Sequence, residues 1–219
     1  MSPTQEHTPW HTRWKEGRIG FHCDKPNEHL KNYVHLLQKG SILLPLCGKS
    51  GDISWLEKQG FEVFGIELVK PAIEAFFAEH KRTPQKQEKE TFSIYQDGNI
   101  SLYHSDFFAL NRQTLGTFDA LYDRAALVAL EPHIRNRYVQ HCLNLLKPKG
   151  RLLLITYDIP LPETQGPPFP VRSPSVSKLY AKASSVQLLK EYTYDQQTEP
   201  KLKERGLSWS KEAIWLIQK

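Results

Sequence analysis

The feature that most constrains the fold is an alternation of short apolar segments with helical ones over the first two-thirds of the chain. The runs SILLPL (41–46) and FEVFGIE (61–67) are typical of buried parallel strands. Residues 52–59 and 71–80 have helical spacing, and Pro71 stands where first-turn prolines are tolerated. Strands that alternate with helices in this way predict a doubly wound α/β sheet.

The remaining segments extend the same pattern. A helix is expected over 27–38 with Asn27 as its cap, and the charged residues 81–91 are expected to form a solvated excursion. FSIYQ and ISLYH, joined by Asp-Gly-Asn, predict a hairpin. Further along we expect a strand at 118–123, a helix at 132–146 left at Gly150, a strand at 151–158, a proline-rich loop at 159–174, and the final segments SVSKLYAKA, VQLLKEYTYD and AIWLIQ.

Composition narrows the class of protein. Hydrophobic residues make up 39 % of the 219 residues and charged residues 24 %, which is typical of a globular chain. No apolar run reaches the roughly 18 residues that a membrane span needs, and the first residues lack the apolar stretch of a signal peptide. The three cysteines are far apart and form no CxxC pair, which favours reduced thiols over disulfides or zinc. We therefore expect a cytoplasmic protein without a metal and without a membrane partner.

The net charge of +5 raises the question of nucleic acid. The basic residues are scattered along the chain without a basic tract, so we expect no nucleic-acid partner. The same charge is compatible with a mild attraction for small anionic substrates.

Candidate binding residues follow three of the expected strands. Ligands of open α/β sheets bind beyond the carboxyl ends of the strands. Leu46, Cys47 and Gly48 follow the first strand, Glu67 closes the second, and Asp106 comes shortly after ISLYH. An acid about twenty residues beyond the first turn can accept both ribose hydroxyls of an adenosine group, because its two oxygens match a cis-diol. A merely solvated acid and an ordinary turn glycine remain the alternatives.

Two other nucleotide motifs are absent. Residues 48–50 (GKS) resemble the end of a phosphate-binding P-loop, but Leu43 stands where that motif needs its first glycine. The chain also contains no GxGxxG, so the nicotinamide and flavin fingerprint is missing.

Several segments in order resemble one known family. They are Trp10, Trp14 and Phe21 with the spacing W-x3-W-x6-F, LPLCGKSGD at 44–52, GIE at 65–67, NISLYHSDFFAL at 99–110, FDALYDRAAL at 118–127, GPPF at 166–169 and ERGLSW at 204–209. Together they closely resemble the thiopurine S-methyltransferase family, in its bacterial form, over nearly the whole chain.

This resemblance implies a fold and an activity. The fold is the class I S-adenosylmethionine-dependent methyltransferase (Rossmann-like) α/β fold, with a seven-stranded, mostly parallel sheet, helices on both faces and a final strand inserted antiparallel. The implied activity is S-methylation of thiopurines and other aromatic or heterocyclic thiols, with S-adenosyl-L-methionine as cofactor and S-adenosyl-L-homocysteine as product. We expect a single domain over 1–219 that acts as a monomer on a small thiol or chalcogen substrate, with the arm 1–26 as an active-site lid.

The resemblance also assigns site residues. The cofactor set is Trp10 as a cover, Leu46 in the first loop, Glu67 at the ribose, Asp106 and Phe107 beside the adenine, and Arg124 near the methionine carboxylate. The substrate set is Phe21 and Arg205.

Each assignment has an alternative. Trp10 and Trp14, four residues apart, could pack a helix onto the core, and Arg124 could pair with Asp123 or Asp119 on the surface. The two substrate-side residues could equally be plain core and a solvated loop.

The expected chemistry needs little covalent help from the protein. Methyl transfer from a sulfonium is an in-line displacement, and an aromatic thiol is acidic enough to be largely thiolate near neutral pH, so we expect no catalytic base. Methylation of selenium or tellurium oxyanions and a non-catalytic S-adenosylmethionine-binding module remain alternatives. A nucleic-acid methyltransferase would need a basic groove or an Asn/Asp-Pro-Pro-Tyr motif, and the sequence has neither.

Overall fold

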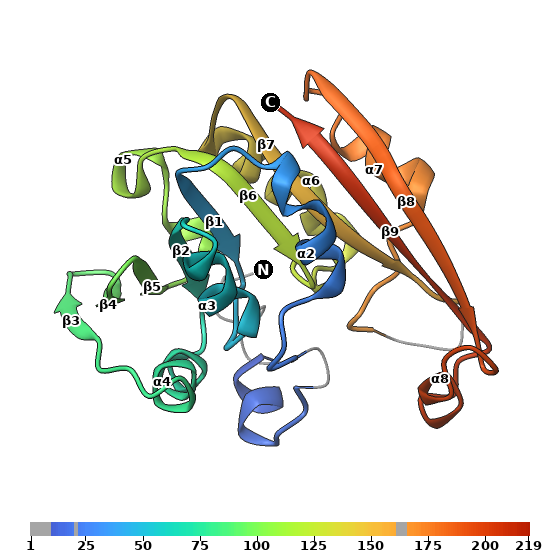
Figure 1. Ribbon diagram of the computed structural model, residues 1–219, viewed down its shortest axis with the longest axis horizontal. Coiled ribbons are helices and arrows are strands. Elements are labelled where there is room, and N and C mark those ends of the chain that lie inside the picture. The colour runs from blue at the N-terminus through green and yellow to red at the C-terminus, as the bar shows by residue number, and fades with distance from the viewer. Residues whose placement is uncertain (1–9, 20–21, 161–165) are drawn as a thin grey trace. The chain divides into compact units, whose positions relative to one another are not determined.

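The computed structural model describes residues 10–19, 22–160 and 166–219 (Figure 1). Its backbone contacts divide the chain into two compact units. The N-terminal unit comprises residues 1–32 and 39–115, and the C-terminal unit comprises residues 33–38 and 116–219. Each unit is described by itself below.

Five paired strands form the N-terminal unit. Their order is β3 (Gln85–Glu88), β4 (Ser93–Asp97), β5 (Ile100–His104), β2 (Glu62–Glu67) and β1 (Ser41–Pro45). β1, β2 and β5 are parallel to one another, whereas β4 and β3 are antiparallel to their neighbours. The hairpin predicted around Asp-Gly-Asn is β4–β5, and Gly98 adopts a φ of 59° in its turn.

Side-chain caps begin two of this unit's helices. The Asn27 side-chain oxygen accepts from the backbone N–H groups of His29 and Leu30 at 2.9 and 3.3 Å, which confirms the predicted cap of α2 (Glu28–Tyr33). The Ser50 hydroxyl accepts from the Asp52 N–H at 3.2 Å and caps α3 (Gly51–Lys58). The other short elements are α4 (Lys70–Glu79), the 3₁₀ turn η2 (Phe107–Ala109) and α5 (Arg112–Leu115).

Four strands form the C-terminal unit, in the order β6 (Phe118–Arg124), β7 (Leu146–Asp158), β9 (Trp209–Gln218) and β8 (Ser185–Asp195). β6 and β7 are parallel, and β9 is antiparallel to both β7 and β8, between which it lies (Figure 1). This is the inserted antiparallel final strand that the family resemblance implied. The helical elements are η1 (Val34–Leu36), η3 (Leu127–Ala129), α6 (Pro132–Leu145), α7 (Ser173–Leu179) and α8 (Lys201–Glu204).

The strand count differs from the seven expected, because the described residues contain nine. One unexpected strand, β3, lies within the segment 81–91 that we expected to be solvated excursion. All four of its side chains are exposed. Its sequence, QKQE, is wholly polar and lacks the alternation of apolar and polar residues that predicts a strand. Only backbone pairing with β4 makes it a strand.

One further expectation is corrected. Gly150 does not leave a helix: α6 ends at Leu145 and β7 begins at once, with Leu146 paired to Phe118 across a register shift. In the arm, residues 10–15 are helical. Its Trp10 and Trp14 therefore stand one helical turn apart.

In the described part of the chain, no helix has the length and apolarity needed to cross a membrane.

Candidate functional site

The carboxyl ends of three parallel strands meet at one edge of the N-terminal unit. In the register of the strands Pro45 lies beside Ile66, and Glu67 lies beside His104. The Ser105 N–H also donates to the Glu67 carbonyl at 3.0 Å. The structure therefore brings the segments after β1, β2 and β5 together, as the sequence predicted for Leu46, Glu67 and Asp106.

Glu67 is the centre of this edge. Its side chain is only 6 % exposed, and each carboxylate oxygen accepts one backbone N–H at 2.8 Å, one from Gly48 and one from Val69. Burial raises the pKa of the Glu67 carboxyl, and these backbone hydrogen bonds oppose the rise. A carboxylate oxygen can accept more than one hydrogen bond, so both oxygens can still bind ligand hydroxyls.

An unusual backbone brings the Gly48 amide to Glu67. Leu46 and Gly48 have φ values of 49° and 55°, and Leu46 is a non-glycine residue in the left-handed region. The intervening Cys47 donates its N–H to the Ile66 carbonyl at 3.0 Å. A Cβ on Gly65 would lie 2.7 Å from the Cys47 sulfur, so glycine is required there to let the turn approach β2. The thiol of Cys47 is buried, and its pKa is raised chiefly by that burial.

Asp106 and Phe107 lie at the end of β5, where the sequence placed them. One carboxylate oxygen of Asp106 accepts the Phe108 N–H at 2.9 Å and caps η2. Phe107 is only 4 % exposed and its ring meets that of Phe108 edge-on at 5.8 Å. Phe107 is therefore almost wholly buried.

In the C-terminal unit, Arg124 ends β6 and stands directly before a tight turn in which Ala125 has a φ of 70°. The neighbouring Asp123 is fully buried. Its carboxylate accepts from the N–H groups of Ala126 and Leu127 at 3.2 and 3.1 Å and from the Tyr138 hydroxyl at 2.7 Å. Asp123 is thus no surface partner for Arg124, contrary to one alternative considered from the sequence.

Burial raises the pKa of Asp123 to about 6, against the opposing effect of the Tyr138 hydroxyl and the two backbone N–H groups. The carboxylate is therefore ionised at neutral pH, in the form that accepts all three hydrogen bonds.

Arg205 is the C-terminal cap residue of α8, directly after Glu204, and is exposed. Its Nη1 lies 3.4 Å from the Tyr157 hydroxyl, and its guanidinium carbon lies 5.7 Å from the centre of that ring. Apolar packing anchors the segment around Arg205. Leu202 and Leu207 are buried with Ile159 in one apolar cluster, and Tyr157 packs against this cluster. The geometry leaves Arg205 accessible and next to an aromatic ring.

The GPPF segment (166–169) is tied to α6 by a residue that the sequence analysis missed. Arg135, 6 % exposed, donates to the carbonyl oxygens of Phe169, Pro170 and Leu130 at 3.0–3.1 Å. Desolvation lowers the pKa of this guanidinium. The signal was present, because Arg135 lies three residues before buried Tyr138 on the apolar stripe of the helix.

Two predicted site residues belong to the arm, Trp10 and Phe21. Trp10 begins the helical segment 10–15, is half-buried, and has the Arg13 guanidinium 5.9 Å from its ring centre. Phe21 and residues 161–165 of the proline-rich segment lie outside the described residues.

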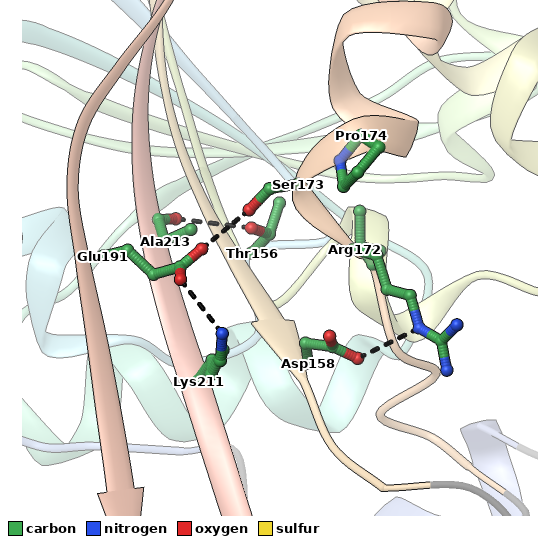
Figure 2. A pocket seen from close by; sticks show the side chains of 9 residues that line it. Thr156, Asp158, Arg172, Ser173, Pro174, Glu191, Lys211 and Ala213 are labelled. Atoms are coloured by element: carbon green, nitrogen blue, oxygen red, sulfur yellow. Dashed lines mark hydrogen bonds and ion pairs between the residues drawn. The ribbon is translucent and has the colours of Figure 1, made fainter.

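The C-terminal unit also contains a cavity of about 180 Å³ that no sequence signal indicated (Figure 2). It lies between β7, β8, β9 and the start of α7, and its charged side chains already pair with one another. Glu191 accepts from Lys211 and Ser173 at 3.2 and 2.9 Å, and the Arg172 guanidinium lies 3.8 Å from the Asp158 carboxylate. None of the predicted site residues lines this cavity.

A group of metal-ligand type exists among the described residues at His22, Asp24 and Glu79. The Lys49 ammonium lies 2.6 Å from the Glu79 carboxylate and supplies a positive charge there, and Asp24 is exposed. The arrangement is that of a surface ion-pair cluster.

Comparison with known proteins gives a consistent result. The family model of thiopurine S-methyltransferase (TPMT) matches residues 5–219. A protein of Nitrosospira multiformis named thiopurine S-methyltransferase is 42 % identical over 212 residues, which cover 95 % of this chain and 96 % of that protein. One from Pseudomonas aeruginosa with the same name is 40 % identical, covering 96 % and 97 %.

Solved structures agree on the fold. A Burkholderia thailandensis 1,6-didemethyltoxoflavin-N1-methyltransferase, crystallised with its substrate and S-adenosylhomocysteine, has a TM-score of 0.66 at 14 % identity and covers all of this chain and 91 % of its own. TehB from Haemophilus influenzae has a TM-score of 0.61 at 12 % identity, covering 88 % and 62 %. Apart from the strand count, the fold class expected from the sequence is confirmed.

The raised pKa of Asp123 gives a pH test with a definite sign. The native state holds this proton up to about pH 6, whereas an unfolded aspartate releases it near pH 4, so the stability contributed by Asp123 is present below that range and is lost as pH rises through it. Relative to Asp123→Asn, the free energy of unfolding of the parent should therefore fall by about 2 kcal/mol between pH 4.5 and pH 7. Denaturant unfolding of both proteins at several pH values measures this difference, and a constant difference would contradict the assignment.

Proposed function

Because the chain belongs to the thiopurine S-methyltransferase family, an S-adenosylmethionine-dependent one, we propose that its methyl acceptor is an aromatic or heterocyclic thiol of the thiopurine class. The observation that carries the proposal is the buried Glu67 carboxylate at the carboxyl edge of three parallel strands. The name and extent of the family match support the proposed acceptor class.

The residues at this edge fit the cofactor. Glu67 keeps acceptor capacity on both oxygens after receiving the Gly48 and Val69 amides, which suits a ribose cis-diol. Leu46 in the adjoining turn is its neighbour in the proposed site, and the Asp106 carboxylate would face the adenine with Phe107 beside it. Arg124 is proposed to bind the methionine carboxylate, because guanidinium and carboxylate pair in a bidentate manner.

When bound, S-adenosylmethionine supplies an electrophilic methyl group on its sulfonium. The protein's own contribution is then to orient the acceptor, exclude water and favour its anionic form. Arg205 is proposed for the last task, since it is a cation that remains accessible beside Tyr157. No side chain needs to remove a proton from a thiol that is already ionised.

Two segments are proposed to cover the site. The helical residues 10–15 carry Trp10, whose large rigid side chain suits a cover over the cofactor. The GPPF segment and Phe21 are proposed to flank the acceptor. Closure of such segments would exclude water during transfer.

A panel of acceptors tests the proposed function. With purified enzyme and S-adenosylmethionine, we expect methylated product from a thiopurine and from thiophenol, measured by mass spectrometry. Selenite and tellurite form the second arm of the panel. Product from the oxyanions alone would replace the thiol proposal, and product from none would favour a non-catalytic binding module.

Replacing Glu67 tests the cofactor edge. Glu67→Ala should weaken the binding of S-adenosylhomocysteine by about 1.5–3 kcal/mol, because two charge-assisted hydrogen bonds are lost. Calorimetry measures the change, with Glu67→Gln as a variant of similar volume and with Glu62→Ala as control, an exposed acid at the other end of β2. Unchanged affinity in both Glu67 variants would end the assignment.

Replacing Trp10 tests the proposed cover. By the same calorimetry, Trp10→Ala should bind S-adenosylhomocysteine more weakly, with little change in the melting temperature of the empty protein.

Replacing Arg205 tests the acceptor side. Arg205→Ala should lower kcat/KM for the thiol about tenfold to a hundredfold, a loss of roughly 1.4–2.8 kcal/mol in transition-state stabilisation, with cofactor affinity within about a factor of two. Arg205→Lys should lie between, and Lys203→Ala, an exposed cation of the same helix, serves as control. Equal kcat/KM in all forms would make Arg205 a solvated surface residue and return its role to Arg124 and Phe21.

A further inference from the structure

One face of α6 contacts two separate segments of the C-terminal unit. Arg135 and Tyr138 are three residues apart, so they project from the same side of the helix, and both are buried. Arg135 reaches residues 169–170, and Tyr138 reaches Asp123 at the end of β6. Neither Arg135 nor Tyr138 is itself assigned to the substrate or the cofactor.

Arg135 binds Phe169 at the end of the GPPF segment, and Pro170 directly after it, through carbonyl oxygens alone. Its planar guanidinium sends one donor to Leu130, one to Phe169 and one to Pro170. Burying a cation is costly unless its donors are satisfied, and here each of its three nitrogens meets a carbonyl oxygen. A lysine at this position could not reproduce the flat, three-armed geometry.

Tyr138 acts on the other segment through Asp123. Its hydroxyl donates to one carboxylate oxygen, and the other oxygen accepts the N–H groups of Ala126 and Leu127. These bonds close the turn that leaves β6 directly after Arg124. The position of the Arg124 backbone therefore depends on the Asp123 carboxylate, which is hydrogen-bonded to Tyr138 of α6.

The two segments are also joined directly. The Phe169 N–H donates to the Val128 carbonyl at 2.7 Å, and Val128 follows the Asp123 turn within η3. These hydrogen bonds form a closed network. Tyr138 of α6 binds Asp123, and Asp123 binds the backbone of residues 126–127. Val128 then binds Phe169, which in turn binds Arg135 of α6.

We propose that Arg135, Tyr138 and Asp123, here called the α6 brace, are positioning residues that fix the Arg124 turn and the GPPF segment in register for methyl transfer. The inference rests on the proposed function, because that proposal assigns Arg124 to the cofactor and GPPF to the thiol. The brace adds that two buried residues of a helix outside the site set both positions.

A pair of tyrosines tests the cofactor half. Tyr138→Phe removes the bond to Asp123, whereas Tyr180→Phe removes an equally buried hydroxyl that has no hydrogen-bond partner among the described residues. Calorimetry should show S-adenosylhomocysteine bound about three- to tenfold more weakly by Tyr138→Phe and within about twofold of the parent by Tyr180→Phe. Binding is measured well below the melting temperature of each variant, where nearly all of the protein is folded. A purely structural role would then lower melting temperatures and leave the dissociation constant unchanged.

A pair of arginines tests the acceptor half. Arg135→Lys should raise KM and lower kcat, with kcat/KM for the thiol about tenfold lower, because a small misplacement of an acceptor is costly. Arg137→Lys, an exposed arginine of the same helix, should stay within about twofold. Hydrogen exchange at the Phe169 amide gives a readout without any acceptor: it should be faster in Arg135→Lys and unchanged in Arg137→Lys.

The outcomes separate the two proposals. Equal S-adenosylhomocysteine affinity in the two tyrosine variants, or equal Phe169 exchange in the two arginine variants, would overturn the brace. A parent enzyme that methylates no thiol would overturn the proposed acceptor, while the affinity and exchange measurements would still decide the brace.

Discussion

The hydrogen bonds from the Gly48 and Val69 amides to the Glu67 carboxylate are the interaction on which the carboxyl edge of β1, β2 and β5 depends. This edge is here called the ligand edge, because the proposed cofactor site lies there. The two hydrogen bonds tie the turn after β1 to the end of β2 and compensate a buried negative charge. The left-handed backbone at Leu46 and the missing side chain at Gly65 serve this arrangement, because they let the turn approach the carboxylate. The group that shapes the loop is thus also the group best suited to recognise a diol.

The C-terminal unit contains a second buried carboxylate that accepts backbone N–H groups, but its effect is different. Asp123, like Glu67, accepts two backbone N–H groups near a strand end. It differs in being completely buried and in receiving a third donor, the Tyr138 hydroxyl. A carboxylate surrounded in this way has no surface left for a ligand, so its effect is exerted on the backbone around Arg124. In the two proposals, Glu67 serves ligand recognition and Asp123 serves positioning.

The sequence predicted those parts of the fold whose signals are local. The Asp-Gly-Asn turn identified the β4–β5 hairpin, and the apolar runs identified the strands whose ends form the ligand edge. β3 escaped prediction because an exposed edge strand needs no apolar residues, only a partner for its backbone. Gly150 was misassigned because pairing of Leu146 with Phe118, a contact distant in sequence, extends β7 back to the end of α6. The role of Arg135 was equally hidden, since two of its three acceptors lie more than thirty residues away.

The burial of Cys47 has a consequence for selectivity. The proposed activity presents an activated methyl group to thiolates in a protein that contains thiols of its own. Desolvation raises the pKa of both Cys47 and Cys142 well above the usual value, so at neutral pH these two sulfurs remain protonated, weakly nucleophilic and enclosed. Cys23 is the exposed one, so a reagent such as iodoacetamide should alkylate it first. Burial thereby shields the Cys47 sulfur, in the turn beside Glu67, from alkylation by a methyl donor bound at the proposed site.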